Sequence, residues 1–202
     1  MKKAIILITA LLISAITFSQ VKLSLLDGTQ YEAKEYSFFN DNSSSFEIKL
    51  EKKNGQLKKK FIEVNDVWSI NDSVLYMPTE DGEFSVEDMR NVVLGKQVAK
   101  KEFNAWWACA GGFVVGAGSM IYLYGYERRP MLGLAVPIIY AAGISFTRPT
   151  KSGIIKRHPD YKDNEYLVYG YQNKGRRKIF TNTIIGTLSG IVVGGVASIF
   201  IK

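Results

Sequence analysis

The stretch IFTNTIIGTLSGIVVGGVASIFI, residues 179–201, decides the fold class of this chain. It has 23 residues and no charged side chain. As an α-helix it would be about 34 Å long, enough to cross a hydrocarbon core of about 30 Å. Gly186, Gly190 and Gly194 follow one another at every fourth position, so they share one helix face. The stretch therefore predicts a transmembrane helix with a packing face of small residues.

Two further uncharged runs precede this stretch, at residues 105–124 and 131–147. We therefore expect about three transmembrane helices, spanning residues 105–124, 131–147 and 179–201. Gly112 and Gly116 repeat the four-residue spacing in the first run. These glycines could pack the protein's own helices or join identical subunits, or they could reflect only that glycine is common in membrane helices.

The three runs differ from those of a typical transporter. Apart from Cys109 and several tyrosines, they contain no ionisable side chain, which argues against a pump or a coupled transporter working alone. Pro137 lies inside the middle run and predicts either a kink or a locally freed carbonyl group. Trp106 and Trp107 stand at the start of the first run, where aromatic rings prefer the membrane interface.

The N-terminus has the layout of a secretory signal peptide. Two lysines follow Met1, residues 4–18 are apolar apart from Thr and Ser, and Thr17 and Ser19 are small residues before a cleavage point. We expect residues 1–19 to be removed. An uncleaved anchor is the alternative, and both interpretations place the next domain outside the cytoplasm.

Residues 20–77 predict a small β domain, an SH3-like barrel or a meander. Apolar and polar residues alternate along several short runs, and Asp27-Gly28 and Asn54-Gly55 are hairpin signals. We expect Trp68 and Phe61 to be core anchors of this small domain. The run Lys58-Lys59-Lys60 is expected to be a solvated strand edge.

Residues 78–103 predict a linker and a juxtamembrane helix. Ser85 offers a side-chain oxygen for the N-cap, and Glu87 and Asp88 place negative charge in the first turn. The expected helix covers residues 85–103 and leads into the transmembrane domain, residues 104–202.

The segment 148–178 is strongly basic, with nine Lys or Arg and three acidic residues. Tyr166 and Tyr169 are one helical turn apart, which predicts a short interfacial helix before the last span. Four basic residues follow, which either bind anionic lipid headgroups or an acidic partner, or serve as ordinary interfacial anchors. These residues are Lys174, Arg176, Arg177 and Lys178.

The membrane topology inferred from the signal peptide conflicts with this charge distribution. A secreted N-terminus and two full crossings would place residues 148–178 outside, whereas basic segments prefer the cytoplasmic side. Either the segment is tolerated outside, or the first hairpin does not cross twice.

Composition excludes several function classes. The formal net charge is +7, but residues 104–202 carry 12 basic and 4 acidic side chains, so the basic excess lies in the most apolar part of the chain. This distribution predicts no nucleic-acid partner. One cysteine and one histidine exclude a disulfide framework and a Cys/His zinc site. His158 is expected to be a solvated loop residue, and we identify no catalytic, cofactor-binding or metal-binding residue.

The chain also resembles a group of uncharacterised envelope proteins of Bacteroidota. The resemblance rests on the hairpin start Leu25-Leu26-Asp27-Gly28-Thr29-Gln30, the strand Val67-Trp68-Ser69-Ile70, the segment Tyr166-Leu167-Val168-Tyr169-Gly170-Tyr171, and the basic Lys174-Gly175-Arg176-Arg177-Lys178 before a glycine-repeat span. The ending Thr17-Phe18-Ser19-Gln20 also resembles signal peptides of that phylum. The resemblance implies location and architecture, and it implies no catalytic residues.

Together these features predict an α+β membrane protein of the inner membrane with a periplasmic N-terminal domain. We expect a non-enzymatic interaction or structural protein whose partners are membrane lipids and either its own copies or an envelope membrane-protein complex. The alternative is a small oligomeric channel or transporter subunit. An enzyme would need a lipid-facing site around His158 and the tyrosines.

Overall fold

A small β region followed by helices makes up the described chain, which confirms the predicted α+β class. The structure is a computed structural model. The chain divides into two units between residues 83 and 84. The predicted signal peptide lies outside the described residues, which are 21–38, 45–52, 54–78 and 84–201.

Two antiparallel sheets form the β unit, with strand orders β2-β1-β6-β7 and β3-β4-β5. Only Lys34 separates β2 from β3, and its backbone N–H donates to the carbonyl of Lys49 at 3.0 Å. The two strands are therefore halves of one bent strand that takes part in both sheets. The elements are β1 (Val21–Leu25), β2 (Gln30–Ala33), β3 (Glu35–Phe38), β4 (Ser45–Glu51), β5 (Leu57–Glu63), the 3₁₀ turn η1 (Val64–Asp66), β6 (Val67–Ile70) and β7 (Ser73–Val74).

Turn residues with positive φ set the register of the hairpins. Gly28 and Gly55 adopt φ values of 80° and 77°, a left-handed conformation that glycine reaches without steric cost. They lie in the β1–β2 and β4–β5 hairpins, so both hairpin predictions are confirmed. The turn between β6 and β7 consists of Asn71 and Asp72, at φ 46° and 68°. Positive φ at both central residues is what a type I′ hairpin turn requires, and this turn was not anticipated.

The core of the β unit confirms one predicted anchor and contradicts the other. Trp68 is 6% exposed and packs against Tyr76, with ring centroids 5.9 Å apart. Phe61 is 57% exposed, so its assignment to the core was wrong. Neighbouring residues of a strand point to opposite faces, and Ile62 is the residue of β5 that points inward. The buried core cluster consists of Leu23, Ala33, Phe46, Ile48, Ile62 and Val67.

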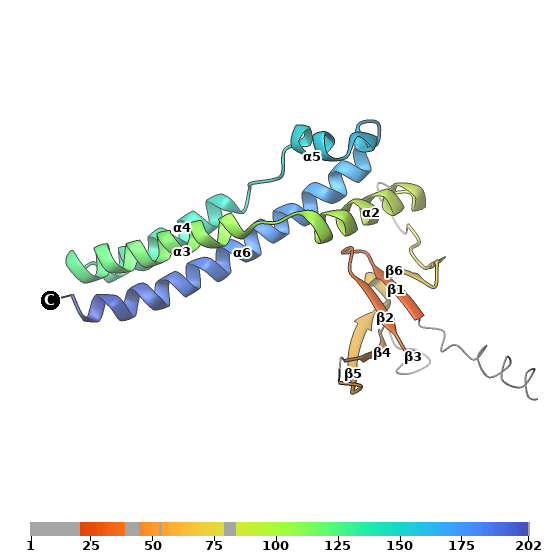
Figure 1. Cartoon of the computed structure of the whole chain (residues 1–202), viewed down its shortest axis with the longest axis horizontal. Helices are drawn as coiled ribbons and strands as arrows, with labels where there is room; N and C mark the ends of the chain where they lie inside the picture. The colour runs from red at the N-terminus through yellow and green to blue at the C-terminus, as the bar shows by residue number, and fades with distance from the viewer. Residues whose placement is uncertain (1–20, 39–44, 53, 79–83, 202) are drawn as a thin grey trace, which may run out of the picture. The chain divides into compact units, whose positions relative to one another are not determined.

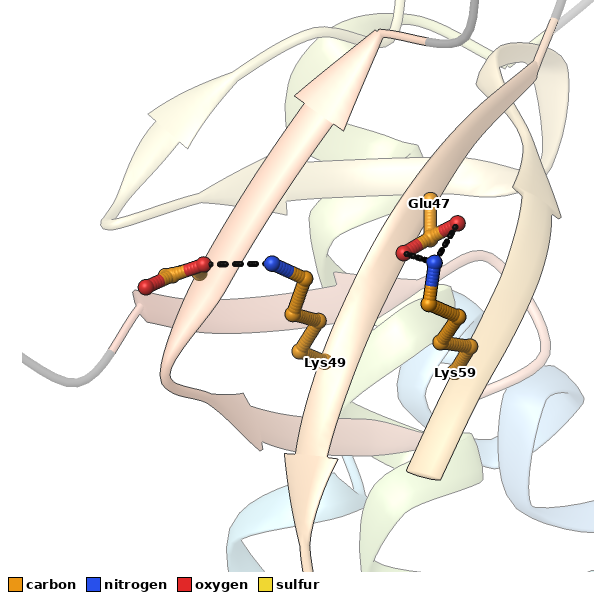
Figure 2. A network of polar contacts seen from close by, with 4 residues as sticks. Glu47, Lys49 and Lys59 are labelled. Carbon is orange, nitrogen blue, oxygen red and sulfur yellow. Dashed lines mark hydrogen bonds and ion pairs between the residues drawn. The ribbon is translucent and has the colours of Figure 1, made fainter. Parts of the chain in front are cut away.

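Ion pairs connect the three strands of the second sheet. Lys59 Nζ lies 3.0 Å from Glu47 Oε1, and Lys49 Nζ lies 2.8 Å from Glu35 Oε2 (Figure 2). The hydrogen bond and the charge of Lys49 lower the pKa of Glu35, and the same contact raises the pKa of Lys49. The pairs therefore link β3 to β4 and β4 to β5 through side chains as well as through the backbone.

The lysines of β5 lie largely where the sequence places them. β5 ends the order of its sheet, and Lys58 and Lys59 are exposed, which confirms the expected solvated edge. Lysines on such a strand discourage pairing with another chain. Lys60 instead lies over the ring of Tyr31, with its ammonium 4.3 Å from the ring centroid.

The helical unit is organised around α6, a helix of 35 residues and about 52 Å. α2 packs along the first half of α6, α3 packs along its second half, and α4 lies beside α3 (Figure 1). The elements are α2 (Val86–Glu102), α3 (Trp106–Ser119), the π-helical segment η2 (Met120–Tyr126), α4 (Pro130–Ile144), α5 (Lys151–Arg157), the 3₁₀ turn η3 (Pro159–Tyr161) and α6 (Glu165–Ile199).

Capping side chains mark where α2 and α6 begin. Ser85 Oγ accepts a hydrogen bond from the N–H of Asp88 at 3.2 Å, as the sequence predicts for the N-cap of α2. Asn164 caps α6 by accepting from the N–H groups of Tyr166 and Leu167. α6 then runs without a break for 35 residues, none of which is a proline. The prediction of a separate short interfacial helix at Tyr166 and Tyr169 is therefore wrong. Those residues belong to the first turns of α6.

Pro137 frees a carbonyl group inside α4, one of the two outcomes predicted for it. Proline has no N–H, so the carbonyl of Gly133 loses its usual partner four residues later. The hydroxyl of Ser119 in α3 donates to this oxygen at 2.9 Å, and Ser119 is buried. The exchange replaces a hydrogen bond within α4 by one between α3 and α4.

Two of the three predicted spans are supported by helix length and composition. The stretch Trp106–Tyr126, with 21 residues, and α6 are long and apolar enough to cross a membrane. α4 occupies the third predicted run with 15 residues, about 22 Å, which is short for a hydrocarbon core of about 30 Å. A third span remains a prediction.

Candidate functional site: the glycine seam and the basic end of the helical unit

The predicted glycines of α3 and α6 face each other within one chain. A Cβ atom at Gly112 would lie 2.6 Å from the carbonyl oxygen of Thr183, and one at Gly116 would lie 2.5 Å from that of Thr187. Methyl groups do not fit at such distances. The two backbones therefore touch wherever α3 presents a glycine to α6.

The glycines of α6 make the reciprocal contacts. A Cβ at Gly194 would lie 2.6 Å from the carbonyl oxygen of Ala117, and a Cβ at Gly186 or Gly190 would overlap the carbonyl of Cys109 or Phe113. The five predicted glycines therefore form one seam, which we call the glycine seam. Close backbone approach brings van der Waals contact that longer side chains would prevent.

A second close approach, between α2 and α6, was not anticipated. A Cβ at Gly95 would overlap the carbonyl of Leu167, and one at Gly170 would overlap the carbonyl of Val92. Gly170 precedes Gly186 by 16 residues, so it continues the four-residue spacing of the glycine seam. That spacing was the available signal, but the lysines and arginines between the two glycines concealed it.

Lys178 is a capping residue, not an exposed headgroup ligand. Its Nζ donates to the carbonyl oxygens of Ala99, Lys100 and Phe103 at 3.2, 2.7 and 2.8 Å. These are carbonyls at the C-terminal end of α2, where the negative end of the helix dipole attracts positive charge; the carbonyl of Ala99 also accepts from the N–H of Phe103 at 3.1 Å. Burial lowers the pKa of Lys178, and the nearby ammonium groups of Lys174 and Lys100 lower it further.

His158 is also placed differently from the expected solvated loop residue. Its ring stacks on Tyr161, with centroids 4.9 Å apart, and its Nε2 lies 2.8 Å from Glu102 Oε2. The His158 side chain is 20% exposed. Burial raises the pKa of the Tyr161 hydroxyl, and the negative charge of Glu102 adds to this. The cluster joins the end of α2 to η3, a tertiary contact that local sequence does not reveal.

The predicted interfacial aromatic residues lie at different positions along the axis of α6. Trp106 and Trp107 are exposed at the start of α3. Tyr166 and Tyr169 each contact the ring of Phe84, with centroids 5.7 Å apart. Tyr166 stands 13 residues before Ile179, about 20 Å along α6. The tyrosines therefore pack at the N-terminal ends of α2 and α6, away from the uncharged part of α6.

The remaining predicted basic residues lie near the middle of α6. Arg176 and Arg177 are exposed, and Lys174 is half-buried. Arg148, in the connection between α4 and α5, lies beside this part of α6 and was not among the predicted site residues. The described residues contain no cluster of three metal-ligating side chains. Comparisons with models of known protein families, with curated proteins and with solved structures give no match.

Proposed function

We propose that this chain is a membrane-anchored, non-enzymatic interaction or structural protein of the bacterial cell envelope. The observation that carries the proposal is the backbone contact of α6 with α2 in its first half and with α3 in its second half. The contact makes a continuous helical body, in which one part is rich in charged side chains and the other is built from the uncharged runs 105–124, 131–147 and 179–201. Such a body is suited to hold a small domain at a membrane surface.

The exposed surface of α3, α4 and α6 supports the membrane assignment. A large contiguous apolar surface is unusual on a soluble monomer and is expected against lipid. We therefore propose three spans, close to residues 105–124, 131–147 and 179–201, with α4 the shortest. Side chains that would face lipid, each at least 64% exposed, include Val114, Ile138, Ile139, Val192 and Ile199.

The β unit is the part we assign to interaction. Its bent strand shared by two sheets and the 3₁₀ turn before β6 support an SH3-like small barrel. We propose that it lies in the periplasm of an inner-membrane protein, behind a cleaved signal peptide. Assignment to the envelope proteins of Bacteroidota rests on the motifs quoted above and is part of the same proposal.

Two experiments test this function. Sodium carbonate washing of isolated membranes should leave the full chain in the pellet, because spans resist extraction that removes peripheral proteins. Affinity purification of the full chain in mild detergent should recover a specific membrane or envelope protein, or a second tagged copy. Release by carbonate would overturn the anchoring. A monomer without co-purifying protein would overturn the interaction role.

A pore-forming oligomer would need a surface other than the glycine seam. The seam glycines of α3 and α6 are covered by each other's backbone inside one chain. Solute flux into liposomes containing the purified chain would nevertheless favour that alternative over the interaction role.

A further inference from the structure

Two adjoining hollows lie where α4 gives way to the connection leading to α5. The first is a small, partly open hollow lined by Arg148, Tyr169, Gln172, Asn173 and Arg176. The second is lined by Ser145, Asn173, Arg176, Arg177 and Phe180. The hollows share Asn173 and Arg176, so they form one continuous notch. We call it the arginine notch.

The arginine notch carries positive charge that the described residues do not neutralise. Within the described part of the chain, Arg148, Arg176 and Arg177 make no ion pair with a carboxylate. Two other basic groups of the helical unit are occupied, Lys178 by carbonyl oxygens and Lys151 by Glu165 at 3.3 Å. Converging guanidinium groups without a counter-charge favour an anion that accepts several hydrogen bonds.

The connection between α4 and α5, which contains Arg148, is held against α6. Gln172 Nε2 donates to the carbonyl oxygen of Pro149 at 2.9 Å. A Cβ at Gly175 would overlap the ring of Pro149, so the proline ring sits directly on the backbone of α6. The backbone at Arg148, next to Pro149, is thereby kept beside the part of α6 that carries Arg176.

The position of the notch along the chain distinguishes among anions. Arg148 directly follows the uncharged run 131–147, and Arg176 stands three residues before the uncharged run 179–201. The second hollow extends from the arginines to Phe180, which belongs to that run. A ligand filling both hollows is charged at one end and apolar at the other. That chemistry fits a phospholipid better than an acidic peptide or a free inorganic anion.

We propose that the arginine notch binds the phosphate group of a phospholipid headgroup, with Arg148 and Arg176 donating to its oxygens and an acyl chain lying along Phe180. The inference rests on the proposed membrane anchoring and names the lipid contact of that anchor. It differs from the sequence-based prediction because Arg148 joins the site, while Lys178 caps α2 and takes no part.

The test is native mass spectrometry of the full chain in detergent, with added phosphatidylglycerol. The wild-type chain should retain the lipid, and the Arg148→Gln/Arg176→Gln variant should bind it about tenfold more weakly. The control is Arg90→Gln/Lys101→Gln, which removes two positive charges from exposed positions of α2. The lipid affinity of this control should stay within about twofold of the wild-type value, because the two changed side chains do not line the notch and their charges are screened by solvent. Arg148→Lys/Arg176→Lys should recover part of the binding.

Three outcomes would overturn the inference. In the first, Arg148→Gln/Arg176→Gln binds the lipid with the same affinity as the α2 control. Inorganic phosphate could displace the lipid from the wild-type chain, which would make the ligand a free anion. A poly-glutamate peptide could bind the notch more tightly than the lipid. Equal circular dichroism spectra for all variants would show that folding is preserved. Carbonate-resistant anchoring together with any of these outcomes would leave the proposed function standing and remove only the lipid site.

Discussion

At the residue scale, Ser119 and Pro137 form a compensating pair. Pro137 removes the N–H that would bind the carbonyl of Gly133, and the Ser119 hydroxyl takes its place. Replacing Ser119 by Ala should leave this buried carbonyl without a partner and lower the stability by about 0.5–2 kcal/mol. Thermal unfolding of the purified chain in detergent measures the change.

A double-mutant cycle separates this hydrogen bond from packing. In a Pro137→Ala background, residue 137 has an N–H again and can bind Gly133 within α4. Ser119→Ala should then cost clearly less than in the wild-type chain. The same cost in both backgrounds would show that the bond to Gly133 contributes nothing, and that Ser119 acts through packing or through its hydrogen bond to the carbonyl of Gly116 at 3.0 Å.

Lys178 supports a second prediction at the scale of a single residue. Its ammonium group binds three carbonyls at the end of α2, so Lys178→Met should remove the donor that Lys100 and Phe103 have, while Ala99 keeps the N–H of Phe103. We expect a loss of about 1 kcal/mol in stability and faster amide hydrogen exchange near the end of α2. The neighbouring Arg177→Met is the control, because Arg177 is exposed. Equal exchange in both variants would contradict the capping role.

At the scale of elements, the glycine seam makes α3 and α6 sensitive to one methyl group. Gly190→Ala would place Cβ against the carbonyl of Phe113, and the helices would have to separate. Overpacking of this kind costs about 1–3 kcal/mol. Gly118→Ala is the matched control, because a Cβ there meets nothing within 4 Å. The expected result is a lower unfolding temperature for Gly190→Ala and an unchanged or higher one for Gly118→Ala; the reverse order would refute the seam.

The sequence predicts those elements whose signals are local. Hairpins at Gly28 and Gly55, the Ser85 cap and the freed carbonyl at Pro137 follow from the conformational limits of single residues, and the structure contains each of them. The glycine spacing likewise identifies which faces of α3 and α6 contain only small residues, but it does not identify their partner.

Features that depend on distant contacts were missed or misassigned. Phe61 and Ile62 are both apolar, and only the pairing of β5 with β4 decides which one points inward. His158 looks solvated because its partners, Glu102 and Tyr161, come together only when η3 packs against α2. The arginine notch needs Pro149 to dock on α6, and neither local pattern nor composition indicates that contact.

At the scale of the whole molecule, the helical unit has two distinct ends. Gly125, at the end of the α3–α4 hairpin, lies next to Ser198 near the C-terminal end of α6. Pro149 and Gly175 meet toward the other end, where α2, α5 and the start of α6 lie (Figure 1). If α3, α4 and α6 cross the bilayer, the basic segment 148–178 and α2 must share one side. The α3–α4 hairpin and the end of α6 must share the other.

This arrangement makes the conflict between signal peptide and positive charge testable. Single cysteines at Arg90, Arg128 and Asp163, introduced into a Cys109→Ala background, report the side of each position through a membrane-impermeant maleimide. We expect Arg90→Cys and Asp163→Cys to react from the periplasmic side, since α2 follows the exported β unit without an intervening span. Arg128→Cys should react only after the inner membrane is opened.

Reaction of all three from one side would mean that the α3–α4 hairpin enters the bilayer without crossing it. Reaction of Asp163→Cys only from the cytoplasm would mean that the positive charges, not the signal peptide, orient the chain.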